Sequence, residues 1–436
     1  MLIERWANTE LLTKLSTNRV VSVVGCRQSG KTTLLLNAPL QHTRFLSLDT
    51  QATFDEAKSD PSFFVRRQSP TTLIIDEIQK VPQLIGEIKY RVDRNPDKGQ
   101  YIISGSSDYR KLPQANESLA GRAGFVRVRT FCEAEQRGCA PGFLQSLFEK
   151  KFPSDKNFEC SKPLVLSTAI HGGFPELLTL SDVDSRTSWF ADYLSNQVLL
   201  DMREQWGVRK KNTIEEVLKA AAIFSSREMV RATLAADFNI AWKTLDTYFS
   251  AIEAMYLVDM VPGWAKKDYD KPGLTPKPFM TDSGLMAHLL HIYSPDDILN
   301  NNEKSQNEGG KLVETWVYNQ LAPEVDLHAP WNIHHFRSRR HEIDFLITNE
   351  KGHVLGIEVK AGESVASDDF QHLHWMQELL GEDHFTGIIL YSGNQVRSGG
   401  RGCFALPMAA MWSDFSTWKP FRSEEHTSEL QSHVMI

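Results

Sequence analysis

The sequence predicts an α/β protein whose amino-terminal part is a parallel sheet covered by helices on both faces. Apolar runs alternate with helical patterns up to about residue 130. One of these runs leads directly into a glycine-rich turn that opens a helix. Another run ends in two carboxylates, as expected of a buried parallel strand that presents acids at its carboxyl-terminal edge. Together, the three observations favour α/β over the other fold classes.

Short apolar segments supply the expected strands. Their alternation with helical patterns is typical of βαβ units, in which the strands lie parallel. The segments are Val20–Val24, Arg44–Leu48, Thr72–Ile75, Tyr101–Ser104 and Gly124–Val128.

The glycine-rich turn has the pattern G-x-x-x-x-G-K-T. Glycines at both ends let successive backbone N–H groups wrap phosphates at a helix amino terminus, where the helix dipole favours negative charge. Lys31 is expected to reach the terminal phosphates and Thr32 to hold Mg²⁺. The pattern therefore predicts that ATP and Mg²⁺ bind to Gly25, Cys26, Arg27, Gln28, Ser29, Gly30, Lys31, Thr32 and, next in the helix, Thr33.

Asp76 and Glu77 follow the apolar run Leu73–Ile75. Alone, such a pair is more often a solvated strand end, but downstream of a phosphate loop it is the expected catalytic partner. Asp76 would complete the Mg²⁺ shell with Thr32, and Glu77 would orient and polarise the attacking water. The sequence therefore predicts an ATPase.

Two further features have both a catalytic and an ordinary interpretation. Ser104 and Ser106 follow the fourth expected strand, where a hydroxyl could contact the γ-phosphate or simply form a turn. Arg122, in Ser118–Arg122, could neutralise transition-state charge in its own chain or in a neighbouring subunit. The alternative for Arg122 is a solvated surface residue.

Residues 161–299 are predominantly helical in pattern. The stretch from Ser226 to Met260 suggests a winged helix, because it combines a helix, a turn, a helix and a strand. Its second helix offers only Lys243 to DNA, with Asp246 beside it. Packing between domains is an equal alternative to DNA binding. Better phosphate candidates follow at Lys266, Lys267, Lys271 and Lys277.

A second group of candidate catalytic residues lies beyond residues 300–310. This stretch is polar, ends in glycine and is expected to be a linker. Two strand patterns, 341–347 and 354–360, flank a turn at 350–352. If this turn is a three-residue loop with Gly352 left-handed, the two strands form a hairpin in a fixed register.

That register sets Asp344 directly opposite Glu358, and Lys360 shares their face of the sheet. Glu314 is available from a helix expected at 311–321. Asp344 and Glu358 would hold a divalent metal, and Lys360 would position or activate water. The alternative is a solvated ion-pair face on an edge hairpin.

Composition limits the partners. The chain has 436 residues, enough for several domains, and a net charge of −7, so nucleic acid would need a local basic patch. We expect a cytoplasmic protein without a membrane partner, because the chain has no apolar signal core and no run of about 18 apolar residues. Residues 422–436 look like the translation of a sequencing adapter, so we expect a non-native tail after Phe421.

Taken together, the motifs resemble a prokaryotic family of AAA-superfamily P-loop ATPases with a C-terminal domain of unknown function, and the Asp344, Glu358 and Lys360 pattern resembles the PD-(D/E)XK nucleases. Cys26 and Thr130–Cys132 depart from the family pattern but leave the ATP site intact. The motifs that carry the resemblance are the phosphate loop, Leu46–Asp49, Ile75–Gln79, Ser104–Ser107, Ser118–Arg122, Gly172–Glu176, Thr281–Leu285 and the hairpin pair.

The resemblance implies a P-loop NTPase core at 1–160, a helical and winged-helix region at 161–299 and a restriction-endonuclease-like α/β domain at 300–421. Three functions remain open: an ATPase that moves its C-terminal module, with DNA as a candidate substrate; a nucleotide-gated binding or signalling switch with an inactive nuclease fold; and an ATP-dependent nuclease in defence or repair. DNA, a protein and a second copy of the chain are the candidate partners besides ATP.

Overall fold

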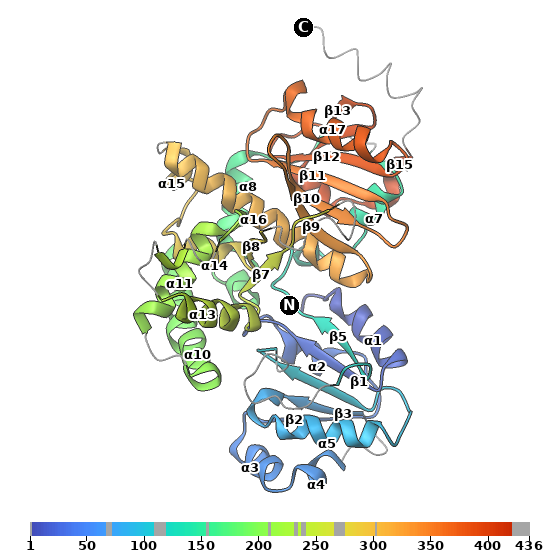
Figure 1. The fold of residues 1–436 in the computed structure, drawn as a ribbon, viewed down its shortest axis with the longest axis vertical. Coiled ribbons are helices and arrows are strands. Elements are labelled where there is room, and N and C mark those ends of the chain that lie inside the picture. Colours follow the sequence, from blue (N-terminus) through green and yellow to red (C-terminus); the bar gives the residue numbers. More distant parts are fainter. Residues whose placement is uncertain are drawn as a thin grey trace. The chain divides into compact units, whose positions relative to one another are not determined.

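The computed structural model describes residues 2–66, 72–108, 119–153, 157–207, 211–230, 234–236, 241–265, 275–300 and 303–420 (Figure 1). Ser118, the lysines at 266, 267 and 271 and the expected adapter tail at 422–436 lie outside these residues. The chain packs as two compact units. Unit 1 comprises Met1–Phe131, Phe174–Val217 and Asn239–Val258, and unit 2 comprises Cys132–Gly173, Leu218–Phe238 and Asp259–Ile436. Both units include parts of the stretch 161–299.

A five-stranded parallel sheet forms the centre of unit 1, as the sequence predicts. Each parallel neighbour brings its carboxyl end to the same edge, where ligands of such sheets bind. The strand order is β2-β3-β4-β1-β5, with bounds β1 Val20–Val24, β2 Thr43–Ser47, β3 Thr72–Asp76, β4 Tyr101–Gly105 and β5 Ala123–Arg127.

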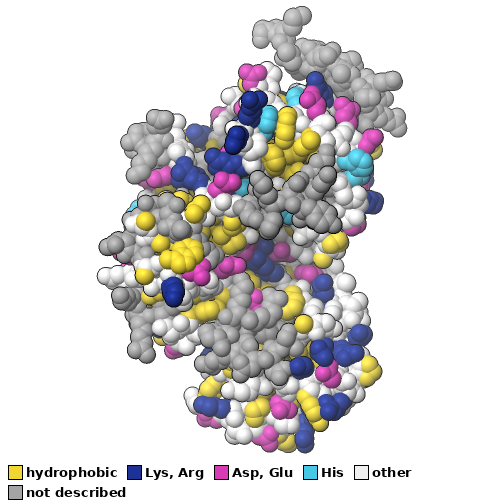
Figure 2. All heavy atoms as spheres, in the orientation of Figure 1, with side chains coloured by type: hydrophobic (Ala, Val, Ile, Leu, Met, Phe, Trp, Pro, Cys, Tyr) yellow, Lys and Arg dark blue, Asp and Glu magenta, His cyan; other side chains and the backbone are white. Residues whose placement is uncertain are grey.

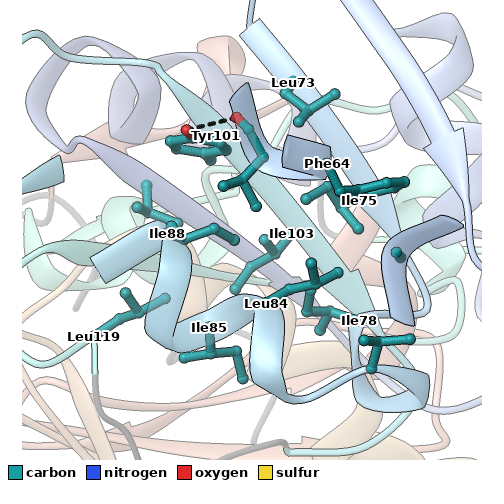
Figure 3. Close-up of a cluster of buried hydrophobic side chains, with 14 of the residues drawn as sticks. Phe64, Leu73, Ile75, Ile78, Leu84, Ile85, Ile88, Tyr101, Ile103 and Leu119 are labelled. Carbon is teal, nitrogen blue, oxygen red and sulfur yellow. Dashed lines mark hydrogen bonds between the residues drawn. The ribbon is translucent and has the colours of Figure 1, made fainter. Parts of the chain in front are cut away.

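Apolar side chains of these strands alternate between two hydrophobic clusters, because successive residues of a strand point to opposite faces. Leu73 and Ile75 belong to one cluster and Ile74 to the other. In the first cluster, helix α5, Gln83–Val92, packs on the sheet, and the Tyr101 hydroxyl donates to the Val65 carbonyl at 3.0 Å (Figure 3). Both faces of the sheet are thus covered, which explains the continuous apolar runs.

Among the described helices of unit 1, α1 precedes the first strand, and the others follow strands or come from the later segments of the chain. Ser185 to Trp206, where the sequence pattern is amphipathic, forms α9 and α10 with a π-helical segment at Leu194–Val198 between them. The helices are α1 Ala7–Thr17, α2 Lys31–Asn37, α3 Gln51–Ser59, α4 Pro61–Val65, α5 Gln83–Val92, α9 Val183–Tyr193, α10 Leu199–Trp206 and α13 Trp242–Ala254.

Unit 2 contains a six-stranded mixed sheet. Its strands β9, β10 and β11 are antiparallel neighbours, whereas β11, β12 and β14 run parallel. The order is β13-β14-β12-β11-β10-β9, with bounds β9 Asn332–Arg337, β10 Glu342–Thr348, β11 Val354–Lys360, β12 Phe385–Tyr391, β13 Arg397–Gly400 and β14 Cys403–Pro407. Helix α17, Gln371–Leu380, packs on this sheet through Leu373 and Met376.

The linker expected at 300–310 is wrong, because helix α16 runs without a break from Glu303 to Leu327. A Cβ placed on Gly309 would lie 2.5 Å from Cγ2 of Ile298, in helix α15 (Asp296–Leu299). Gly309 is therefore needed for close packing of the two helices rather than for a flexible linker. Tertiary contact outweighs the low helix propensity of the sequence.

The winged helix expected between Ser226 and Met260 stays a prediction, because residues 231–233 and 237–240 of that stretch lie outside the described residues. The described parts of the stretch include α13 and the start of β7, Val258–Val261, which pairs with β8, Lys277–Met280. Helix α11, Lys211–Phe224, precedes it. Among the helices of the described residues, none combines the length and the apolar composition needed to cross a membrane.

Candidate functional site

The phosphate loop lies between the carboxyl end of β1 and the start of α2. Gly25 has a φ of +153°, and a Cβ there would lie only 2.1 Å from the backbone oxygen of Val128. Gly30, with a φ of +97°, precedes the first residue of α2. The loop therefore requires glycine at both positions, for space at Gly25 and for backbone conformation at Gly30.

Lys31 is buried, and its ammonium donates to the backbone carbonyls of Gly25 and Cys26 at 2.9 and 2.8 Å. Burial lowers the pKa of Lys31, whereas the negative charge of Glu77 acts in the opposite direction. The amine is thus held within the phosphate loop by two of the loop's own carbonyls.

Arg27 makes an ion pair that the sequence did not reveal. Its guanidinium donates from Nε and from a terminal nitrogen to the two carboxylate oxygens of Asp201 in α10, the latter at 2.8 Å. The Asp201 side chain is 2% exposed, and the Tyr193 hydroxyl donates to the Arg27 carbonyl at 3.4 Å. These hydrogen bonds therefore join the phosphate loop to the α9–α10 segment of unit 1.

Asp76 ends β3 beside the loop, where it accepts a hydrogen bond from Oγ1 of Thr32 at 3.0 Å. Ser104, in β4, donates to the other carboxylate oxygen of Asp76. The hydroxyl of Thr32 and the carboxylate of Asp76 are hard oxygen donors of the kind that Mg²⁺ prefers. The residues present thus fit the Mg²⁺ that accompanies ATP.

Glu77 has a left-handed backbone, with a φ of +60°, and its side chain is part of a buried polar network. Oε2 of Glu77 accepts from the Gln79 amide and, at 3.4 Å, from the Ser106 hydroxyl. The same amide also donates to Ser106 at 3.1 Å. Burial raises the pKa of Glu77. The network fixes the carboxylate in place, and Gln79 is a member of it to which no role had been given from the sequence.

The structure does not bring Arg122 to this site. Its carbonyl accepts from Val20 N at the start of β1, whereas the phosphate loop follows the end of that strand, about 16 Å away at 3.3 Å per residue. Its guanidinium makes two hydrogen bonds to Asp93, one of them at 3.0 Å. Action on ATP bound to the same chain is therefore excluded by this geometry, and action across a subunit boundary stays a prediction.

A largely apolar cavity of about 450 Å³ adjoins the phosphate loop within unit 1. Thr33, Leu34 and Asn37 of α2 form one side of it, next to Gly30. The Arg5 guanidinium lies over the Phe131 ring, 3.9 Å from its centre, at another side. The position of this cavity beside the loop suits a nucleobase.

In unit 2, the hairpin of β10 and β11 has the register that the sequence predicts. Phe345 pairs with Ile357 and Thr348 with Val354, and Gly352 is left-handed with a φ of +74°. Continuation of this register sets Asp344 opposite Glu358. The prediction of a three-residue loop is confirmed.

The acids of this hairpin face a polar cavity of about 720 Å³ within unit 2, which Glu314 of α16 also lines. Asp344 accepts from the Val359 amide at 2.8 Å. The Lys360 ammonium lies 3.6 Å from Glu358 and 3.3 Å from Asp369. Burial, and next the charge of Asp344, raise the pKa of both Glu314 and Glu358 to about 8.

Lys277, a candidate phosphate contact from the sequence, is instead buried and paired with acids. Its side chain is 2% exposed and lies in the same cavity, 3.1 Å from Glu342 and 3.6 Å from Glu314. No motif in the sequence links this lysine of β8 to the hairpin, since the contact arises only from the packing of unit 2.

The nuclease resemblance implies a divalent metal here, but the side chains do not fit one as they stand. Throughout the part of the chain that the structure describes, no three His, Cys, Asp or Glu side chains converge so that they could hold a metal ion. The ammonium of Lys277 already lies among the carboxylates. Metal binding by Asp344 and Glu358 is therefore a prediction that this arrangement does not support.

Comparison with known families divides the chain into three matched parts. Residues 17–136 match the family model of an AAA domain, residues 164–296 match a domain of unknown function (DUF8612), and residues 309–411 match another (DUF4143). The first match and the geometry of the loop define the class: the chain contains a P-loop ATPase domain of the AAA type.

Similar proteins come from bacteria and archaea. An uncharacterized protein of Mycobacterium tuberculosis is 27% identical over 366 residues, covering 83% of this chain and 74% of its own. One of Methanocaldococcus jannaschii is 21% identical over 396 residues, covering 83% and 82%. Among solved structures, a Walker-type ATPase of Pyrococcus abyssi is 14% identical with a TM-score of 0.38, covering 66% of this chain and 96% of that one.

Proposed function

We propose that the protein hydrolyses ATP at the phosphate loop of unit 1. The observation that carries the proposal is the hydrogen bond of 3.0 Å between Thr32 and Asp76, which joins the loop to the acidic strand end. Glu77 follows directly, in a left-handed conformation that presents its carboxylate to the Gln79 and Ser106 network.

Each residue has a distinct task in this proposal. Backbone N–H groups of the loop and the Lys31 ammonium bind the phosphates, and the apolar cavity beside α2 receives the base. Thr32 and Asp76 would hold Mg²⁺, which neutralises charge on the phosphates when bound. Glu77 orients the attacking water and accepts its hydrogen bond, and the network around Glu77 prevents the carboxylate from turning away.

Loss of ATP binding on removal of the Lys31 amine tests this assignment. Lys31→Ala should bind a fluorescent ATP analogue at least about tenfold more weakly than the wild type, since one phosphate-binding cation is lost. Lys14→Ala is a matched control, because Lys14 lies in the last turn of α1, away from the loop. Unchanged nucleotide affinity in Lys31→Ala would refute the site.

A second candidate function is nucleic-acid binding by the acidic cavity of unit 2 and its surroundings. The β10–β11 register supports it, because Asp344, Glu358 and Lys360 gather on one face as in the nucleases that the hairpin resembles. Arg227, Lys311 and Arg337 also line the cavity and could contact phosphates. We infer that ATP hydrolysis in unit 1 controls the use of this module.

Two observations favour binding over cleavage. The residues do not fit a metal, and on the face drawn in Figure 2 the described basic side chains of either unit are interspersed with acidic ones, without a continuous basic surface. Neither observation supports an extensive DNA-binding surface. The binding switch with an inactive nuclease fold is therefore preferred here over the ATP-dependent nuclease.

A DNA assay distinguishes the binding switch from the nuclease. Plasmid and linear DNA are incubated with the full chain and Mg²⁺ or Mn²⁺, with and without ATP. The wild type should shift DNA in a gel without cutting it. Cleavage that disappears in both Lys360→Ala and Asp344→Asn would establish the nuclease instead, and its dependence on ATP would be tested with Lys31→Ala.

A further inference from the structure

Lys277 is the most deeply buried cation of the acidic cavity in unit 2. It begins β8, and its ammonium donates to Oε1 of Glu342 at 3.1 Å and lies 3.6 Å from Oε1 of Glu314. Its side chain is 2% exposed, whereas those of Glu314 and Glu342 are 16% and 43% exposed. A lysine is rarely buried to this degree unless it is paired.

Acids from two elements surround this ammonium. Glu314 comes from α16, and Glu342 and Asp344 come from β10. Burial alone would lower the pKa of Lys277, but the charges of these three carboxylates raise it by more. The amine is therefore kept as an ammonium, and its charge stays among the acids.

The acids are not fully satisfied by this one cation. Oε1 of Glu358, a residue that is 5% exposed, has no hydrogen-bond partner, and the same is true of Oε1 of Glu314. Adjacent buried carboxylates repel one another unless protons or a cation neutralise them. Both oxygens are thus available to a further cation if the Lys277 ammonium, 3.6 Å from Glu314, is removed.

We propose that Lys277 is a built-in cation that takes the place of a divalent metal in the acidic cavity of unit 2. The proposal deepens the second candidate function and rests on its cavity, but on neither ATP hydrolysis nor DNA cleavage. It explains why carboxylates that resemble a metal site do not converge as ligands. It also predicts that removal of the ammonium creates a metal site.

Titration of the nucleotide-free full chain with Mn²⁺, followed by calorimetry, tests the proposal. The wild type should show no tight site in unit 2. Lys277→Met should gain one Mn²⁺ site, at least about tenfold tighter than any wild-type binding, because a positive charge within about 4 Å of the acids is gone. Asp344→Asn in the Lys277→Met background should remove the gain.

Two controls separate charge from fold. Lys311→Met removes an equal charge from the lining of the same cavity, but the Lys311 amine donates to the carbonyl of Ile223 at 3.2 Å instead of to the acids, so no site should appear. Lys277→Arg keeps the cation and should bind Mn²⁺ as weakly as the wild type. Equal Mn²⁺ affinity in Lys277→Met and the wild type would overturn the proposal, as would a tight wild-type site that Asp344→Asn abolishes.

Lys277→Met leaves Glu342 and Glu314 without their cation and could unfold. In that case Mn²⁺ should raise its unfolding temperature while leaving that of Lys311→Met unchanged. The double variant Lys277→Met, Glu342→Gln removes one charge of each sign and provides a second test in a more balanced cavity. Absence of a Mn²⁺ site from the folded double variant would overturn the proposal. The outcome does not depend on ATP turnover or DNA cleavage, so failure here is distinguishable from failure of either proposed activity.

Discussion

The ion pair between Arg27 and Asp201 should be a major source of stability for the phosphate loop. Replacement of Arg27 by alanine leaves the Asp201 carboxylate, 2% exposed, without its cation. Loss of one partner of a fully buried pair costs roughly 3–5 kcal/mol. Because 31% of the Arg27 side chain is exposed, water can replace part of the interaction. We therefore expect Arg27→Ala to lower the free energy of unfolding by about 2–3 kcal/mol.

Urea unfolding, followed by circular dichroism, measures this loss. Arg203→Ala is the matched control, since Arg203 lies on the exposed side of the same helix α10 and should cost less than about 0.5 kcal/mol. The double variant Arg27→Ala, Asp201→Ala should cost clearly less than the sum of the single variants, because neither residue leaves the other unpaired. Additive costs, or a loss in Arg27→Ala no larger than in Arg203→Ala, would refute the reasoning.

Three further predictions concern the ATP site. Gly25→Ala should abolish ATP binding measured by calorimetry, because its Cβ would lie 2.1 Å from a backbone oxygen, whereas Gly310→Ala, which has open space, should bind normally. Since burial raises the pKa of Glu77, ATP hydrolysis should be lost on acidification at a higher pH than the usual glutamate range; a kcat profile that falls only within that range would contradict this. If Arg122 acts across a subunit boundary, mixing Arg122→Ala with Lys31→Ala protein should restore part of the ATPase activity, and unchanged activity of Arg122→Ala alone rules that role out.

The sequence predicted the parts of the molecule whose geometry is encoded locally. The phosphate loop needs glycine at fixed spacing between a strand and a helix, so Gly25, Gly30 and Lys31 could be identified directly. The three-residue hairpin loop was equally local, because one left-handed residue, Gly352, fixes the register of both strands. The five parallel strands were also predicted nearly at their observed bounds, because each is encoded by a short local run of apolar residues.

The missed features depend on residues that are far apart in the chain. Asp201 binds Arg27 across 174 positions, and Lys277 meets Glu342 across 65. The sequence around Asp201 and around Glu342 contains no motif that predicts the basic partner of either acid. The linker prediction failed for a related reason, since the contact of Gly309 with Ile298 makes a helix of a segment that is polar and rich in glycine when considered alone.

The substitution Glu77→Gln tests whether Glu77 acts on the attacking water. The substitution is nearly isosteric and keeps a side chain that can hydrogen-bond within the Gln79 and Ser106 network. Affinity for an ATP analogue and phosphate release should be measured on the same preparation, with the wild type beside it. We expect wild-type affinity but turnover reduced at least about 100-fold, because binding uses other groups and only the reaction uses the carboxylate. Full turnover by Glu77→Gln would contradict it.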